Sequence, residues 1–175
     1  MAVALCVFFA MGFASCSKDG DEPDTKSIYG IWAEDGDPES WGLLITKDCS
    51  IMDDAHIGCA GFVPYLNASY ETLEKRFAPN DEFFVYRYDS KNNVYILYSG
   101  DYEDEKGNIL FDTNYPLLCR MTISKDIMEA QYQWPEFDYD GLVTREELLS
   151  NSKYASVPSN VKINFKEVRV YKRYK

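Results

Sequence analysis

Residues 135–149 (PEFDYDGLVTREELL) have the spacing in this chain that best fits metal chemistry. Counted from Glu136 as position 1, oxygen-bearing side chains fall at positions 1, 3, 5, 9 and 12, and Gly141 falls at position 6. Calcium takes about six to eight oxygen ligands, and this spacing lets carboxylates converge as a loop winds around the ion. The candidate calcium ligands are Glu136, Asp138, Asp140, the backbone carbonyl of Leu142, Thr144 and Glu147.

The spacing resembles the calcium loop of EF-hand proteins, in which the glycine permits a sharp turn and the last glutamate is a bidentate ligand. It departs from that pattern at position 1, where Glu136 replaces the usual Asp, and in the strand-like sequence that precedes the loop. The same residues also fit a turn followed by a helix, with Thr144 as the N-cap and Glu147 completing a capping box. The sequence leaves the calcium site and the capped helix open as alternatives.

The other candidates for catalysis or metal binding are weaker. His56 is the only histidine, and a weak metal site with Asp53 and Asp54 competes there with an ordinary loop. An acidic run lies in polar sequence, which offers no apolar surroundings to raise a carboxyl pKa for acid catalysis. That run consists of Asp101, Glu103, Asp104 and Glu105. We therefore predict that the chain is not an enzyme.

The start of the chain indicates export. Residues 1–15 carry no charged side chain, and the run is shorter than the roughly 20 residues that cross a bilayer, so it fits a secretory signal. The order Phe13-Ala14-Ser15-Cys16 resembles the signal of bacterial lipoproteins, although Leu is usual at the place of Phe13 and no Lys or Arg precedes the run. The resemblance implies that residues 1–15 are removed and that Cys16 is lipidated. An ordinary signal peptide or a buried N-terminal segment is the alternative.

Residues 16–27 are predicted to be a disordered tether, because they are polar and rich in acids and include Gly and Pro. An acidic patch after Cys16 resembles the surface-export signal of Bacteroidetes lipoproteins. Its residues are Lys18, Asp19, Asp21 and Glu22. The expected location is therefore the outer membrane or the cell surface, with the lipid chains as the membrane anchor.

Composition limits the domain count and the functions expected of the remaining residues, 28–175. They are enough for one domain, and the net charge of −11 argues against nucleic-acid binding. Aromatic residues make up 15% of the chain, which suits β-strands and also surfaces for carbohydrates or apolar ligands. Cys49, Cys59 and Cys119 allow one disulfide and one buried thiol, with Cys49–Cys59 as one candidate pair.

Aromatic and β-branched segments predict a mainly β domain. The clearest are two hairpins, formed by residues 82–89 with 93–100 and by residues 116–124 with 127–134. Residues 161–170 alternate and change phase at Lys166-Glu167, which indicates a strand with a bulge. Helical spacing occurs at residues 66–77, and a second helix is expected at residues 144–152. We predict an antiparallel β-barrel of about eight strands with one or two short helices.

The lipid signal, the short tether, Gly30-x-Trp32 in the first strand, the hairpins and a basic last strand together resemble the lipocalin-like lipoproteins of Bacteroidetes. The resemblance implies that Trp32 packs at the closed end of the barrel and that Arg169 or Arg173 stacks on it. It also implies a cavity for a small apolar ligand. We therefore expect a membrane-anchored, non-enzymatic binding or interaction module. The alternative is a calcium-binding surface module for glycan or partner adhesion.

Overall fold

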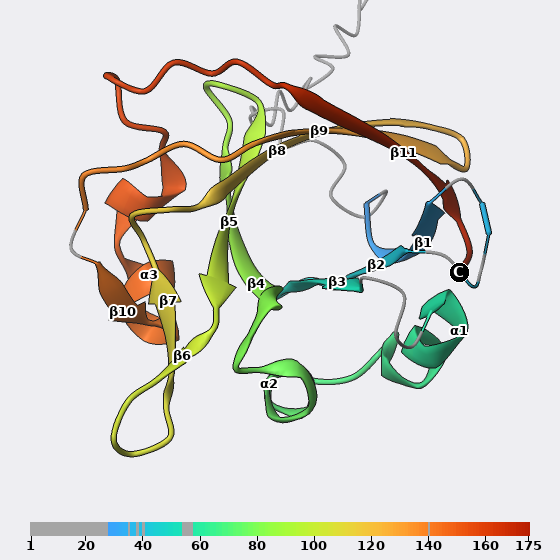
Figure 1. Cartoon of the computed structure of the whole chain (residues 1–175), viewed down its shortest axis with the longest axis horizontal. Helices are drawn as coiled ribbons and strands as arrows, with labels where there is room; N and C mark the ends of the chain where they lie inside the picture. Colours follow the sequence, from blue (N-terminus) through green and yellow to red (C-terminus); the bar gives the residue numbers. More distant parts are fainter. Residues whose placement is uncertain (1–27, 35, 38, 40, 54–57, 140) are drawn as a thin grey trace, which may run out of the picture.

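The computed structural model describes residues 28–34, 36–37, 39, 41–53, 58–139 and 141–175 and shows a mostly β protein (Figure 1). Eight antiparallel strands close into a barrel in the order β1-β11-β9-β8-β5-β4-β3-β2. The barrel strands are β1 (Gly30–Glu34), β2 (Gly42–Ile45), β3 (Ser50–Asp53), β4 (Asn80–Asp89), β5 (Val94–Gly100), β8 (Leu117–Ser124), β9 (Ile127–Gln133) and β11 (Glu167–Arg173). The predicted mainly β fold and the closed antiparallel barrel are confirmed.

The remaining elements pack on the outside of the barrel wall (Figure 1). A small sheet in the order β10-β7-β6 lies beside β5 and is formed by Leu142–Thr144, Ile109–Asp112 and Tyr102–Glu103, respectively. The α-helices are α1 (Gly58–Phe62), α2 (Tyr70–Phe77) and α3 (Arg145–Ser150). Among the described residues, Val63–Tyr65 (η2) and Ser152–Ala155 (η3) form short 3-10 helices.

The two ends of the barrel differ in their connections. At one end, which we call the turn end, neighbouring strands are joined by short turns at residues 46–49, 90–93 and 125–126. Strand β1 begins at this end, and strand β11 ends there. At the other end, the loop end, the connections are residues 35–41, 54–79, 101–116 and 134–166. The loop end therefore carries all of the long connections between the barrel strands.

Side chains alternate between the two faces of each strand, and this sorts the apolar residues into two clusters. The inner cluster takes residues from all eight barrel strands and fills the interior, with Trp32, Phe84, Leu97, Tyr132 and Tyr171 among its buried members. The closed wall also leaves no unpaired sheet edge in the barrel.

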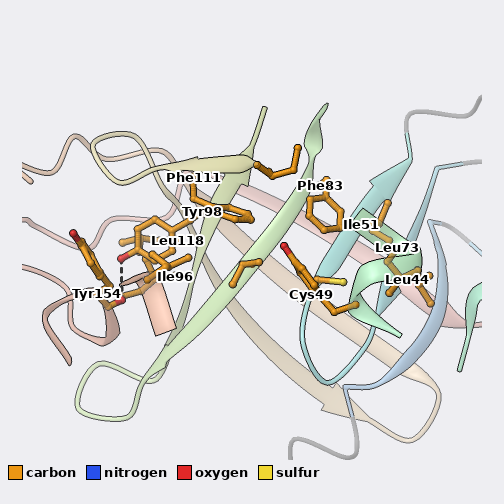
Figure 2. Packing of buried hydrophobic residues seen from close by; sticks show 14 of the residues in the cluster. Leu44, Cys49, Ile51, Leu73, Phe83, Ile96, Tyr98, Phe111, Leu118 and Tyr154 are labelled. Atoms are coloured by element: carbon orange, nitrogen blue, oxygen red, sulfur yellow. Dashed lines mark hydrogen bonds between the residues drawn. The ribbon is translucent and has the colours of Figure 1, made fainter. Parts of the chain in front are cut away.

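The outer cluster lies between the barrel wall and the helices and small sheet (Figure 2). Outward-facing Phe83, Ile96 and Tyr98 meet Leu73 of α2 and Phe111 of β7 there. The hydroxyl of Tyr98 donates to the carbonyl of Tyr154 at 2.8 Å, which ties η3 to β5 (Figure 2). The long connections of the loop end thus fold back over the wall of the barrel.

The hairpins predicted at residues 82–100 and 116–134 are confirmed as β4–β5 and β8–β9. The helix expected at residues 66–77 begins only at Tyr70, because the Ser69 side chain accepts from the Thr72 amide as an N-cap. The short helix α1 was not predicted, since residues 48–64 show no clear period.

The strand predicted from residue 161 begins only at Glu167, so that boundary was wrong. Val161, Ile163 and Phe165 do pack against the outer cluster. The backbone between these residues does not pair with a neighbouring strand. Instead, the side-chain amide of Gln133 donates to the Lys162 carbonyl. Alternation here reflects packing of an irregular segment.

Candidate ligand-binding site at the loop end of the barrel

The turn end is sealed by the residues that the G-x-W motif singled out. Trp32 is fully buried, and its Nε1 donates to the Ile28 carbonyl at 2.8 Å. The guanidinium carbon of Arg173 lies 4.1 Å from the indole centroid, and Nη1 of Arg173 donates to the Tyr29 carbonyl at 2.8 Å. Arg173, rather than Arg169, is therefore the basic residue stacked on Trp32. A Cβ on Gly30 would collide with the Lys175 carbonyl, so a side chain at position 30 does not fit.

The predicted calcium loop lies on the outside, next to the small sheet. Glu136 and Asp138 are exposed and line a hollow of about 340 Å³ with Asn114. Asp140 lies outside the described residues. Across the ranges that the structure covers, no group of three or more Asp, Glu, His or Cys side chains is placed to hold a metal ion. The calcium site stays a prediction.

The alternative interpretation of the same stretch matches the local geometry. Leu142–Thr144 is β10, paired with β7, and the Thr144 side chain accepts from the Glu147 amide at 3.3 Å as the N-cap of α3. Gly141 has a φ of +85°, and its carbonyl accepts from the amide and the hydroxyl of Thr113. The turn and the cap thus have structural partners within the chain.

The other residues considered for chemistry have structural surroundings. The carboxylate of Asp104 accepts from the amides of Lys106 and Asn108, which shapes the turn between β6 and β7. The side-chain amide of Asn108 also donates to this carboxylate at 2.7 Å, and this bond, followed by the bonds from the backbone amides, holds the pKa of Asp104 below its ordinary value. His56 and Asp54 lie outside the described residues, as does the side chain of Asp53.

The candidate disulfide Cys49–Cys59 is not formed, and Cys119 is not joined to either. Cys49 lies in a tight turn at the turn end, whereas Cys59 lies in α1, with its Sγ 3.5 Å from the Trp32 carbonyl. Burial raises the pKa of Cys49 to about 11, against a hydrogen bond from Thr46 that lowers it. This thiol is therefore protonated at neutral pH and unsuited to nucleophilic chemistry.

Two tryptophans stand at the loop end with exposed indoles. Trp41 directly precedes β2 and is 43% exposed, and Trp134 directly follows β9 and is 58% exposed. Leu43 and Tyr132, two positions away in the same strands, belong to the inner cluster. By alternation the indoles lie on the interior side of the wall. Exposed aromatic side chains next to an apolar interior are typical of a ligand-binding surface.

The side chain of Arg169 covers part of Trp41. Its guanidinium carbon lies 5.0 Å from the indole centroid, and its Nε donates to Oε1 of Glu167 at 2.6 Å. Arg169 belongs to β11 and Trp41 precedes β2, and β1 lies between these strands in the barrel. Arg169 therefore reaches across the interior side of β1.

Trp134 leans across the end of the barrel. Its ring centroid lies 6.5 Å from that of Phe84, which belongs to the inner cluster. β9 and β4 are separated by β8 and β5 in the barrel. The indole of Trp134 thus forms part of a roof above Phe84, with most of its surface open to solvent.

A buried hydroxyl lies under this roof. Ser99 pairs with Phe84 and follows Leu97 by two residues, so it faces the interior. It is 8% exposed, and its hydroxyl makes no hydrogen bond to any residue that the structure describes. Leaving such a group without a partner costs about 1–3 kcal/mol. Ser99 is therefore a place where a bound polar group is favourable.

The interior of the barrel contains two hydrogen-bonded phenols near these residues. The hydroxyls of Tyr132 and Tyr171 lie 3.2 Å apart and are buried. Burial raises the pKa of Tyr171 to about 12 and lifts the pKa of Tyr132 well above its usual value. Both phenols therefore stay neutral and act by hydrogen bonding and packing.

Among the described strand residues, Glu34, Glu167 and Arg169 are charged and face the interior at the loop end. The strand register places Glu34 opposite Tyr171 and Glu167 opposite Tyr132. Along β11, Arg169 lies between Glu167 and Tyr171. Burial alone would lower the pKa of Arg169, but the hydrogen bond to Glu167 and the nearby charges, including Glu34, raise it above its ordinary value. The loop end therefore combines exposed aromatic surface with charged side chains, above a pair of buried neutral phenols.

The sequence analysis singled out only Arg169 of these residues, and for a stack at the other end. It missed Trp41, Trp134, Ser99 and Glu34, which come from separate segments. The sequence did contain one signal for the two tryptophans, namely their position. Each lies at the end of a strand, at a place in the alternation that faces the interior.

Comparison of the chain with protein-family models, with curated proteins and with solved structures found no match. In the part of the chain that the structure describes, no helix has the length and apolar character needed to cross a bilayer.

Proposed function

We propose that this chain is a non-enzymatic binding module of a membrane-anchored bacterial lipoprotein, and that it binds a small apolar ligand at the loop end of its barrel. The observation that carries the binding proposal is the pair of exposed indoles, Trp41 and Trp134, beside the inner cluster. Aromatic surface that stays exposed next to a packed interior gains free energy when an apolar ligand covers it, at about 25 cal/mol per Å². The unpartnered hydroxyl of Ser99 supports the same location.

The ligand proposal is tested with a neutral fluorescent probe, N-phenyl-1-naphthylamine, titrated into the purified full chain. Binding is expected to raise the probe's emission, and Trp41→Ala and Trp134→Ala are expected to weaken it. Tyr115→Ala is the matched control, because Tyr115 is also an exposed aromatic residue, at 56%, but lines the hollow next to Glu136. Equal losses in all three variants, or no binding by the unmodified chain, would contradict the proposal.

The anchor proposal rests on the sequence before the domain, since Cys16 lies outside the described residues. Its test is metabolic labelling of the full chain in a bacterial host with an alkyne analogue of palmitate. Label is expected on the unmodified chain and is expected to disappear in Cys16→Ser. A Cys16→Ser chain that labels as strongly as the unmodified one would refute this part of the function.

A further inference from the structure

Ser99 lies at the loop end of the barrel interior. Among the inward-facing residues of β5 it is the one nearest to that end, and Leu97 lies deeper, in the inner cluster. Ser99 is 8% exposed, and its hydroxyl makes no hydrogen bond to the residues that the structure describes. We propose that Ser99 sets the specificity of the site, which binds an apolar molecule through one neutral hydrogen-bonding group, such as a hydroxyl or a carbonyl. This inference rests on the proposed function, because it names the ligand class of the same site.

The members of the inner cluster that pair with this part of β5 are apolar. Ser99 lies opposite Phe84 of β4, and Leu97 lies opposite Leu117 of β8. A hydroxyl buried among such side chains gives up its hydrogen bonds to water, and this loss weakens the fold. An alanine at the same position avoids the loss. We therefore assign the Ser99 hydroxyl to binding rather than to stability.

A ligand reaches Ser99 by way of Trp134. The indole of Trp134 lies over Phe84, with 6.5 Å between the ring centroids, and Phe84 is the residue that pairs with Ser99. Trp134 is 58% exposed, so most of its surface is in contact with solvent and little packing opposes its rotation. An apolar ligand that takes the place of this indole over Phe84 brings its polar group to Ser99, and the displaced indole then covers the ligand.

The surroundings of Ser99 favour a neutral group over a charged one. A hydroxyl both donates and accepts, so it pairs with an alcohol, a ketone or an amide. Burying a charged group costs far more free energy than burying a neutral one, unless an opposite charge accompanies it. At the loop end, Arg169 and Glu167 bond to each other on β11, and β9 and β8 lie between β11 and β5 in the barrel.

The test is displacement of N-phenyl-1-naphthylamine from the full chain by p-tert-butylphenol and by p-tert-butyltoluene at neutral pH. The two compounds have nearly the same shape, and a hydroxyl in the first replaces a methyl group in the second. Ser99→Ala is expected to weaken displacement by the phenol about five- to tenfold, because one neutral hydrogen bond is lost. Displacement by the toluene is expected to stay unchanged or to become stronger.

The matched control is Thr113→Val, which removes a buried hydroxyl that has a partner. The Thr113 hydroxyl donates to the Gly141 carbonyl at 2.7 Å, on the outside of the barrel. Thr113→Val is expected to lower the thermal midpoint and to keep the relative displacement by phenol and toluene. Ser99→Ala is expected to leave the midpoint unchanged or raised, because no hydrogen bond within the chain is lost.

The outcomes separate this inference from the proposed function. Unchanged relative displacement in Ser99→Ala, or a thermal midpoint lowered as in Thr113→Val, would assign the Ser99 hydroxyl to the fold or to a buried water and overturn the inference. An equal change of relative displacement in Thr113→Val would overturn it as well. Failure of the unmodified chain to bind the probe would refute the proposed function, and the inference with it.

Discussion

Arg173→Ala is expected to destabilise the barrel far more than Arg169→Ala, although both arginines belong to β11 and each lies over an indole. At the turn end, Trp32 is fully buried and the guanidinium of Arg173 lies 4.1 Å from its centroid. At the loop end, Trp41 is 43% exposed and the distance to Arg169 is 5.0 Å. The two sites thus differ mainly in solvation.

The magnitude follows from the contacts that each substitution removes. A desolvated cation–π contact contributes about 2 kcal/mol, and a hydrogen bond from a charged donor, here to the Tyr29 carbonyl, contributes about 1.5–3 kcal/mol. These contributions overlap, so the expected loss for Arg173→Ala is about 2–4 kcal/mol. The contact of Arg173 with Asp126 at 3.8 Å adds little, because Asp126 is 82% exposed. For Arg169→Ala the expected loss is about 0.5–1 kcal/mol.

The assay is urea unfolding of each variant, followed by tryptophan fluorescence and analysed by linear extrapolation. Arg173→Lys is the informative intermediate, since it keeps the charge but lacks the planar group that stacks on Trp32 and reaches Tyr29. Arg173→Lys is expected to lower the free energy of unfolding by about half as much as Arg173→Ala does. If Arg169→Ala costs as much as Arg173→Ala, or if Arg173→Ala costs less than about 1 kcal/mol, the assignment of the turn end as the sealed end is refuted.

Three further predictions concern single residues. Gly30→Ala is expected to cost about 2–3 kcal/mol in thermal unfolding, because position 30 has a φ of +136° and a Cβ there meets the Lys175 carbonyl. Gly107→Ala, at a φ of +80° with open space around it, is expected to cost about 1 kcal/mol, and equal losses would contradict the packing argument. Burial alone would raise the pKa of Asp89, but hydrogen bonds from Val157, Asn92 and Lys91 hold this pKa below its ordinary value. The Asp89 carboxylate therefore stabilises the fold above a pH of about 4. This contribution to stability is lost as the pH falls through the lowered pKa. Asp89→Asn is therefore expected to lower stability at pH 7 by about 2 kcal/mol and by progressively less in acid, and a deficit that does not change with pH would sink this account. If the loop at residues 136–147 binds calcium, millimolar calcium is expected to raise the thermal midpoint relative to chelator, and Glu147→Gln is expected to abolish the rise; no calcium-dependent shift would reject the site.

The parts of the fold that could be predicted from the sequence are those that depend on residues close together along the chain. The hairpins β4–β5 and β8–β9 follow from aromatic strands on both sides of short polar turns, and the turn residues Asn93 and Lys125 have positive φ values. The closure of β1 against β11 joins residues about 140 positions apart, and no local pattern specifies it. The small sheet β10-β7-β6 is also formed from distant segments, and for that reason residues 109–112 could not be assigned to it in advance.

The candidate site could not be predicted for the same reason. Trp41, Trp134 and Arg169 come from three connections or strand ends, and only barrel closure brings them to one place. By contrast, the stretch at residues 136–147 has a strong local spacing because a turn and a helix cap use the same residue types as a calcium loop. Thr144 is occupied as an N-cap, and the Gly141 carbonyl is occupied by Thr113. Local spacing therefore identifies a stretch on the outside of the barrel, where the turn and the helix cap account for the same residue types.

The difference between the two ends is the reason why we place the proposed binding site at the loop end. Alternation along β11 puts Arg169, Tyr171 and Arg173 on one face, so the sequence of the strand treats both ends alike. At the turn end, the residues before β1 close over Trp32, whose Nε1 bonds to the Ile28 carbonyl. At the loop end, the helices and the small sheet formed by the long connections pack against the outside of the wall, as the outer cluster shows. The apolar side chains that the structure describes in those connections pack on the wall, whereas Trp41 and Trp134 stay exposed. Covering these two indoles is the gain in free energy that we propose for a ligand.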